Sequence, residues 1–184
     1  DGDQDLVVTG YSSDASAAVS KLYINEGSAV FSEASASLDA VDYGSSTFCD
    51  VDGDGDADLL LTGNDNSKIA VLYINDGSGS FTKDRQSSNG SSPVFTGVYF
   101  SSSNIVDVDS DGDLDILVTG RHGSSTDLAT LYVNGGDGDF SKAAAGIAGV
   151  FQGSSDFADL EGDGDQDLVV TGYSTATIYE NTLY

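Results

Sequence analysis

The residues most able to do chemistry are acids gathered into three short loops of the form D-x-[DE]-x-D-G-D-x-D. Carboxylates at positions 1, 3, 5 and 9 converge on one point if the backbone wraps around it, and the Gly residues between them permit the tight turns that this wrapping needs. Hard oxygen ligands in a flexible cage suit Ca²⁺ better than Mg²⁺, and the loops contain no His or Cys of a zinc-type site. The spacing therefore predicts calcium sites.

We assign side-chain ligation to positions 1, 3, 5 and 9, and we expect position 7 to contribute its backbone carbonyl. In the third loop Glu161 is one methylene longer than its counterparts, which predicts an altered geometry. A fourth, partial site at the start of the chain keeps only the second half of the motif, so we expect it to be weak or empty. The predicted metal ligands are Asp50, Asp52, Asp54, Asp56 and Asp58; Asp107, Asp109, Asp111, Asp113 and Asp115; Asp159, Glu161, Asp163, Asp165 and Asp167; and, in the partial site, Asp1, Asp3 and Asp5.

Two other interpretations of these loops are weaker. An EF-hand loop needs a bidentate Glu at position 12, but Leu61, Val118 and Val170 stand there. A plain hairpin with a solvated acidic turn would leave four or five acids within nine residues to repel one another without a cation. The acidic loops hold 18 of the 31 acids of a chain whose net charge is −25. Metal binding and folding should therefore be thermodynamically coupled.

The acidic loops belong to a longer repeat. The matched residues Asp1, Asp54, Asp111 and Asp163 are 53, 57 and 52 positions apart. Each loop is followed by an apolar run ending in Thr-Gly and then by a Tyr-x-Asn element, and residues 1–12 are identical to residues 163–174. Such self-similarity indicates a repeat architecture.

Each repeat is expected to consist of strands. Its apolar runs are four to eight residues long, rich in β-branched and aromatic residues, and bounded by Gly, Asp, Ser or Asn, whereas no segment keeps a helical period. In the third unit we expect strands at 103–108, 115–120, 129–134 and 140–144, with the acidic loop between the first and the second. Four-stranded antiparallel units of this length favour β-propeller blades over a solenoid.

The predicted fold is therefore all-β, a run of about 3.5 four-stranded antiparallel propeller blades with repeats of roughly 52–57 residues. We expect one propeller region over residues 1–184. Its blade units cover approximately 1–42 (partial), 43–97, 98–151 and 152–184 (partial). The partial units at both ends favour a segment of a longer propeller, with self-assembly of copies through open blade edges as the second possibility.

The three acidic loops, the following strand that ends in Thr-Gly, and the Leu-Tyr-x-Asn segment resemble the FG-GAP or VCBS type of repeat. This repeat is the blade unit of the integrin α-subunit propeller and of many bacterial surface proteins. The resemblance covers essentially the whole chain and implies calcium in the hairpin between the first and second strands of each blade. The Phe-Gly and Gly-Ala-Pro signatures of the family are poorly kept, which places the chain nearer the bacterial VCBS-like group.

Composition and motifs exclude several classes of function. A strongly acidic chain is unsuited to nucleic acid or to anionic membrane surfaces, and no apolar stretch is long enough for membrane insertion. The single histidine, His122, and the single thiol, Cys49, lie outside any catalytic motif, and we interpret them as a loop residue and a small core residue. The recurrent tyrosines are interpreted as packing residues.

We therefore expect a non-catalytic, calcium-stabilised module for adhesion, recognition or scaffolding. Its expected partner is an extracellular protein or glycan. Exposed loops of this kind need the free Ca²⁺ concentrations found outside cells, so secretion or display at the cell surface is expected. The alternatives are a lectin-like propeller that binds carbohydrate once per blade, and the propeller part of a polysaccharide-active enzyme.

Overall fold

The computed structural model describes residues 2–86, 94–136, 138–173 and 177–179. These residues form strands and no helix, so none of them builds a helix that could cross a membrane. The all-β prediction is confirmed. The strands are β1 Leu6–Ser12, β2 Ala17–Asn25, β3 Phe31–Ala34, β4 Asp42–Cys49, β5 Asp58–Asp65, β6 Ser67–Asn75, β7 Phe81–Lys83, β8 Tyr99–Val106, β9 Asp115–Arg121, β10 Asp127–Asn134, β11 Phe140–Lys142, β12 Phe151–Ala158, β13 Asp167–Tyr173 and β14 Thr177–Tyr179.

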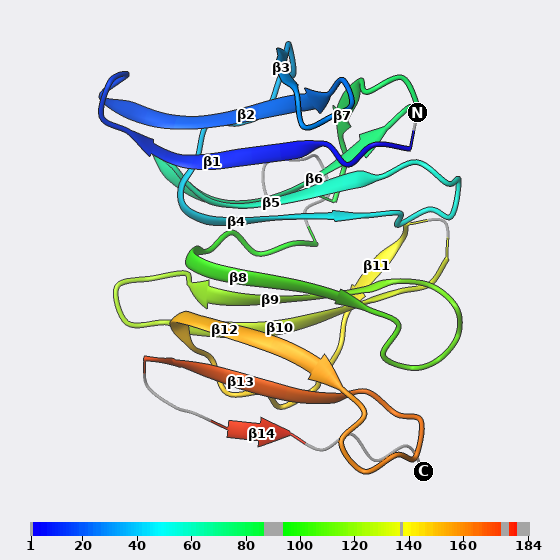
Figure 1. Ribbon diagram of the computed structural model, residues 1–184. Helices are drawn as coiled ribbons and strands as arrows, with labels where there is room; N and C mark the ends of the chain where they lie inside the picture. Colours follow the sequence, from blue (N-terminus) through cyan, green and yellow to red (C-terminus); the bar gives the residue numbers. More distant parts are fainter. Residues whose placement is uncertain (1, 87–93, 137, 174–176, 180–184) are drawn as a thin grey trace.

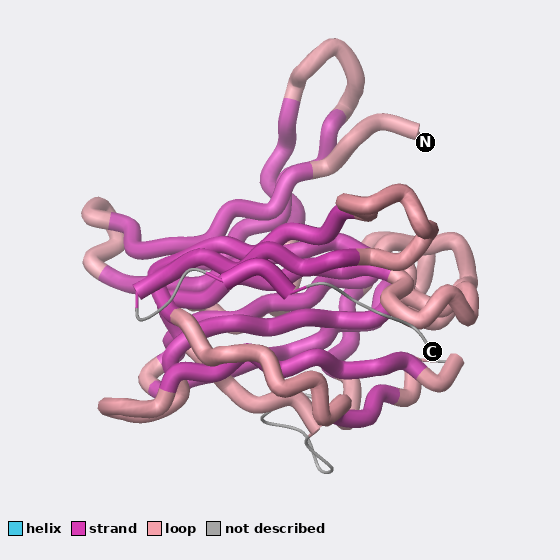
Figure 2. The backbone as a smooth tube through the Cα atoms, turned by 90° about the horizontal axis from the view of Figure 1, so that it is seen from below, coloured by secondary structure: helices cyan, strands magenta, loops and turns pink. Residues whose placement is uncertain are grey.

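The strands form four antiparallel sheets in chain order. Two sheets have four strands, β4 to β7 and β8 to β11, and two have three, β1 to β3 and β12 to β14. Each is a meander in which consecutive strands pair, as expected for propeller blades. The sheets follow one another through the molecule, with the three-stranded ones at its two ends (Figure 1). Seen along the other direction, strands fill the middle and loops lie towards the periphery (Figure 2).

The core lies between consecutive sheets. Leu60 and Leu72 of the second sheet pack against Ile116 and Val118 of the third, and similar clusters join the first sheet to the second and the third to the fourth. Both faces of a central blade are therefore covered. This is why β5 has three consecutive leucines after Asp58, all fully buried, instead of alternating apolar and polar residues.

Two of the recurrent tyrosines join their blade to the linker that precedes it. Tyr73 and Tyr132 are fully buried, and their hydroxyl oxygens accept hydrogen bonds from the backbone N–H groups of Asp39 (2.7 Å) and Thr96 (2.8 Å). The predicted packing role is confirmed for these two residues. Tyr23 is only half-buried, and the side chain of Tyr179 lies outside the described part of the chain.

A bulge near the start of each first strand explains the recurrent Thr-Gly. In the second sheet Asp42 pairs with Asn64 and Ser45 pairs with Thr62, so two residues of β4 face Gly63 alone. The same offset recurs in β8 and β12. Gly63 has φ 145°, and a Cβ there would lie 2.8 Å from the Asp42 carbonyl oxygen. Only glycine fits this position. Because the bulge lengthens the strand, β8 begins at Tyr99, earlier than the predicted residue 103.

Candidate metal centres

The acidic loops connect the first and second strands of the sheets, as the spacing predicted. Residues 50–57 join β4 to β5, residues 107–114 join β8 to β9, and residues 159–166 join β12 to β13. All three loops lie at the same end of the sheets, the right-hand side in Figure 1.

The first acid of each loop organises the backbone around it. The two carboxylate oxygens of Asp50 accept hydrogen bonds from the N–H groups of Gly53 (2.8 Å) and Gly55 (3.0 Å). Asp107 accepts in the same way from Asp111 and Gly112, and Asp159 accepts from Gly162, Asp163 and Gly164. These bonds curl each loop around its first acid, the wrapping that the sequence pattern required.

Two loops gather carboxylate oxygens tightly enough to hold one cation. One oxygen from each of Asp50, Asp52 and Asp54 lies within 4.8 Å of the others, and a similar group is formed by Asp107, Asp109 and Asp115. All-oxygen donor sets with several carboxylates suit a hard divalent cation such as Ca²⁺. The residues present therefore fit the predicted ion.

The third loop is different. Among the residues that the structure describes, no three acids of loop 159–167 come within that distance of one another. Glu161, whose extra methylene predicted an altered site, is exposed. Calcium ligation by Asp159, Glu161, Asp163 and Asp167 remains a prediction, as it does for the first two loops.

The ninth acid of each loop has a structural role that sequence reasoning missed. Asp58, Asp115 and Asp167 are buried, whereas their loops are largely exposed. One oxygen of Asp115 accepts from the N–H of Val108 (2.9 Å) and the other from the N–H of Asn134 (2.9 Å). Asp58 makes the same pair of bonds with Val51 (3.0 Å) and Asn75 (2.8 Å). The ninth carboxylate thus ties its loop to the end of the third strand.

The Asn of the Tyr-x-Asn element completes this connection. The Asn75 side chain donates to the Ala57 carbonyl (3.1 Å) and accepts from the Gly77 N–H (3.2 Å). Asn134 repeats both kinds of contact, to Leu114 and Gly136, and also donates to the Val51 carbonyl of the preceding blade (2.8 Å). The strict recurrence of Asn two residues after each Tyr was the sequence signal for this role.

The seventh acid of the loop turns towards the hairpin between the third and fourth strands. A Cβ on Gly77 would meet an Asp56 carboxylate oxygen at 2.3 Å, and one on Gly136 would meet Asp113 at 3.3 Å. Asp3 lies in the same way against Gly27. Neither Asp56 nor Asp113 belongs to the gathered oxygens. Ligation by the backbone carbonyl of position 7 stays a prediction.

The electrostatics of the loops favour a cation. Burial raises the pKa of Asp58 and Asp115, and nearby acids raise it further, although the backbone N–H donors oppose both effects. Burial and the neighbouring carboxylates of Asp111 and Asp107 also raise the pKa of Asp109. Each raised pKa reflects charge that the fold confines at a cost. A divalent cation among these oxygens would remove that cost.

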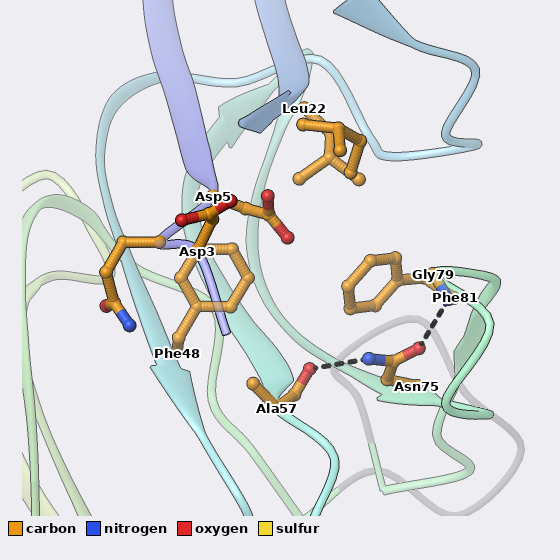
Figure 3. A pocket seen from close by; sticks show the side chains of 10 residues that line it. Asp3, Asp5, Leu22, Phe48, Ala57, Asn75, Gly79 and Phe81 are labelled. Carbon is orange, nitrogen blue, oxygen red and sulfur yellow. Dashed lines mark hydrogen bonds between the residues drawn. The ribbon is translucent and has the colours of Figure 1, made fainter. Parts of the chain in front are cut away.

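The partial loop at the start of the chain is only partly described. Asp1 lies outside the described residues, and Asp3 and Asp5 are exposed. Asp5 nevertheless accepts from the Asn25 N–H (2.9 Å), the counterpart of the ninth-position bond. Asp3 and Asp5 border a pocket of about 200 Å³ between the first two sheets, which is also lined by Leu22, Phe48 and Phe81 (Figure 3).

The single histidine lies away from the acidic loops, and the single cysteine lies inside the core. His122 is exposed in the loop between β9 and β10, with Nδ1 2.8 Å from the Gly97 carbonyl oxygen. Cys49 is buried at the end of β4, where burial above all raises the pKa of its thiol to about 12. Both positions agree with the loop and core interpretations.

Four successive antiparallel sheets, three of them with an acidic loop between the first and second strands, are the arrangement expected of propeller blades. The model of the FG-GAP-like repeat matches residues 1–61, 50–118 and 107–170, so the chain belongs to the FG-GAP-like repeat family. No curated protein matches the sequence significantly.

A solved structure similar in fold is a lectin from Agrocybe aegerita, described as recognising non-reducing terminal N-acetylglucosamine. The TM-score is 0.52 at 17% sequence identity over 96% of this chain. At that identity the likeness concerns the fold alone. The match covers 49% of the lectin, so this chain spans about half of its length.

Proposed function

We propose that the chain is a calcium-stabilised, non-catalytic recognition or scaffold module that works outside the cell or at its surface. The observation that carries the proposal is the gathering of three carboxylate oxygens within 4.8 Å in each of two loops of an FG-GAP-like repeat. Groups so close repel one another unless a cation lies among them.

In this proposal the ion acts as a cross-link. Asp50, Asp52 and Asp54 would hold one Ca²⁺, and Asp107, Asp109 and Asp115 another. Each ion would fix the loop that joins the first and second strands. The ninth acid, which accepts a hydrogen bond from the end of the third strand, would hold that strand against the fixed loop. Binding to the folded state alone stabilises it by mass action.

The proposed location follows from the affinity of such sites. Exposed, flexible calcium sites in extracellular modules have dissociation constants of about 10⁻⁴–10⁻³ M, which match calcium levels outside cells. The many Asp side chains that face solvent would then be partly neutralised in the place where the protein works. Adhesion, recognition or scaffolding is the role that a rigid repeat without catalytic groups would perform.

Calorimetric titration of the metal-stripped protein with CaCl₂ tests the proposal. We expect saturable binding of at least two ions, with one lost in Asp52→Asn and the other in Asp109→Asn. Asp14→Asn, which removes an exposed acid from the β1–β2 turn, is the matched control and should leave the stoichiometry unchanged. Equal losses in all three variants, or no saturable binding, would refute site-specific calcium.

Glycan recognition is the second candidate, because a row of aromatic side chains, exposed at its two ends, lies at the end of the sheets away from the acidic loops.

A further inference from the structure

Aromatic rings form a continuous row across three blades. The Tyr43 ring lies 4.7 Å from that of Phe100, Phe100 lies 6.3 Å from Phe151, and Phe151 lies 5.2 Å from Tyr173. Tyr99 adds a further ring beside Phe100, at 4.8 Å. The row crosses the starts of β4, β8 and β12, at the left in Figure 1, opposite the acidic loops.

The backbone holds the row in a strained geometry. Tyr43 and Phe100 occupy the bulge of their strands with φ 50°, and Gln152 occupies the third bulge with φ 51°. Positive φ is uncommon for bulky side chains, and such strain concentrates where proteins bind ligands. Tyr43 is also 58% exposed, so much of its ring is open to a ligand.

The chemistry of the row favours a neutral ligand. Arg121 stacks its guanidinium 3.4 Å from the Phe151 ring centroid, and its Nε donates to Asp127 at 2.8 Å. Its charge is therefore already matched by a carboxylate. With a net charge of −25, the molecule also repels anionic ligands. Exposed ring surface is greatest at the two ends of the row, at Tyr43 (58%) and Tyr173 (71%), whereas Phe100 is half-buried and Phe151 is buried.

We infer that this aromatic row binds the neutral pyranose rings of an oligosaccharide chain. The inference rests on the proposed role as a recognition module. A pyranose has an apolar face of C–H groups that stacks on an aromatic ring, and hydroxyl edges that hydrogen-bond to neighbouring polar side chains. Tyr43 and Tyr173 are the exposed stacking residues at the two ends, and Phe100 and Phe151 join them. Successive sugar rings would engage successive blades, so affinity would rise with chain length.

Matched variants separate stacking from folding. Tyr43→Asn removes the ring, and Asn tolerates positive φ, so this variant should be at least as stable as the wild type. Tyr173→Ser removes the ring at the other end, which is 71% exposed. Tyr11→Ser is its control. Tyr11 stands in the identical Thr-Gly-Tyr-Ser sequence and is 63% exposed, but it lies on β1 and makes none of the ring contacts of the row.

The experiment is calorimetric titration in millimolar CaCl₂ with four neutral hexasaccharides, those of cellulose, chitin, laminarin and β-mannan. We expect at least one to bind with submillimolar affinity, and its trisaccharide to bind more weakly. Tyr43→Asn and Tyr173→Ser should weaken binding at least about tenfold, the effect of one lost stacking contact, and Tyr11→Ser less than about twofold.

Binding by none of the four hexasaccharides would overturn the inference, as would equal weakening by Tyr11→Ser. A preference for a protein ligand with no sugar bound would overturn it as well. Calcium titration of the same samples keeps the two proposals apart. Normal calcium binding without sugar binding would remove the glycan site and leave the proposed function standing, whereas absent calcium binding would count against the proposed function itself.

Discussion

At the scale of single residues, the nine-position motif contains two kinds of acid that look alike in sequence. The first acids are half-buried or exposed and curl the loop, whereas the ninth is buried and, in Asp58 and Asp115, accepts two backbone hydrogen bonds. The spacing predicted where the carboxylates lie. The spacing did not predict that the ninth acid accepts two hydrogen bonds, because the second donor is an Asn 19 residues away, at the end of the neighbouring strand.

This difference predicts opposite phenotypes within one loop. Asp115→Asn replaces an acceptor oxygen with an amide that cannot accept, so a buried N–H loses its partner. Unfolding free energy should fall by about 2–3 kcal/mol already in EDTA, because the backbone hydrogen bonds do not depend on the ion, and part of the gain from calcium should be lost as well. Asp109→Asn relieves repulsion at an exposed position, so the metal-free protein should keep its stability and lose part of the gain from calcium. Urea unfolding of both variants, each in EDTA and in CaCl₂, measures this. The same response from both would contradict the division of roles.

Tyr73 predicts a loss of stability in alkali. Burial raises the pKa of its phenol above the ordinary value near 10. Between the two pKa values the unfolded chain loses the proton and the folded one keeps it. The stability that burial of the neutral Tyr73 phenol contributes to the folded state is therefore fully present below about pH 10 and falls as the pH rises further.

Tyr73→Phe should cost about 1 kcal/mol at pH 8, since the Asp39 N–H loses its acceptor, and should lose less stability than the wild type between pH 8 and 11. Tyr11→Phe, at an exposed position, is the control. Urea unfolding at the two pH values measures both effects, and parallel losses in wild type and Tyr73→Phe would exclude Tyr73 as a source.

At the scale of elements, the recurrent Thr-Gly reports a contact between strands. Because the first strand bulges towards the second, the glycine opposite the bulge has no space for a side chain. Gly63→Ala should lower the unfolding free energy by roughly 1–3 kcal/mol through strain and displacement of the Asp42 carbonyl. Gly135→Ala is the control, since a Cβ there meets its nearest neighbour at an ordinary 3.5 Å. Equal effects in chemical unfolding would mean that the bulge is unstrained.

Strand order and loop positions were predictable because alternating apolar runs and turn residues are local signals. Contacts between blades could not be predicted from the sequence. Gln86 is buried and links the second sheet to the third. Its side chain donates to the Gly138 carbonyl (2.6 Å) and accepts from the Phe140 N–H (2.8 Å). Nothing near Gln86 in the sequence marks it, because its partners lie more than fifty residues away. The aromatic row was missed for the same reason.

At the scale of the whole molecule, polar contacts link the first strands of neighbouring blades. The hydroxyl groups of Ser45 and Thr47 lie 3.0 and 2.7 Å from that of Ser103. These contacts and the three core clusters join sheets that each carry acids at one end. Calcium at that end would reduce the repulsion between them. Packing between the sheets and charge repulsion between their acidic loops thus both contribute to the free energy of folding.

The central claim is best tested by thermal unfolding of the metal-stripped protein in EDTA and in millimolar CaCl₂, with MgCl₂ as the matched cation. We predict a large rise in melting temperature with Ca²⁺ and a much smaller one with Mg²⁺, because two gathered carboxylate sites bind the larger ion in the folded state only. Equal melting temperatures in EDTA and CaCl₂, with no calcium retained by elemental analysis, would show that the loops are merely acidic turns.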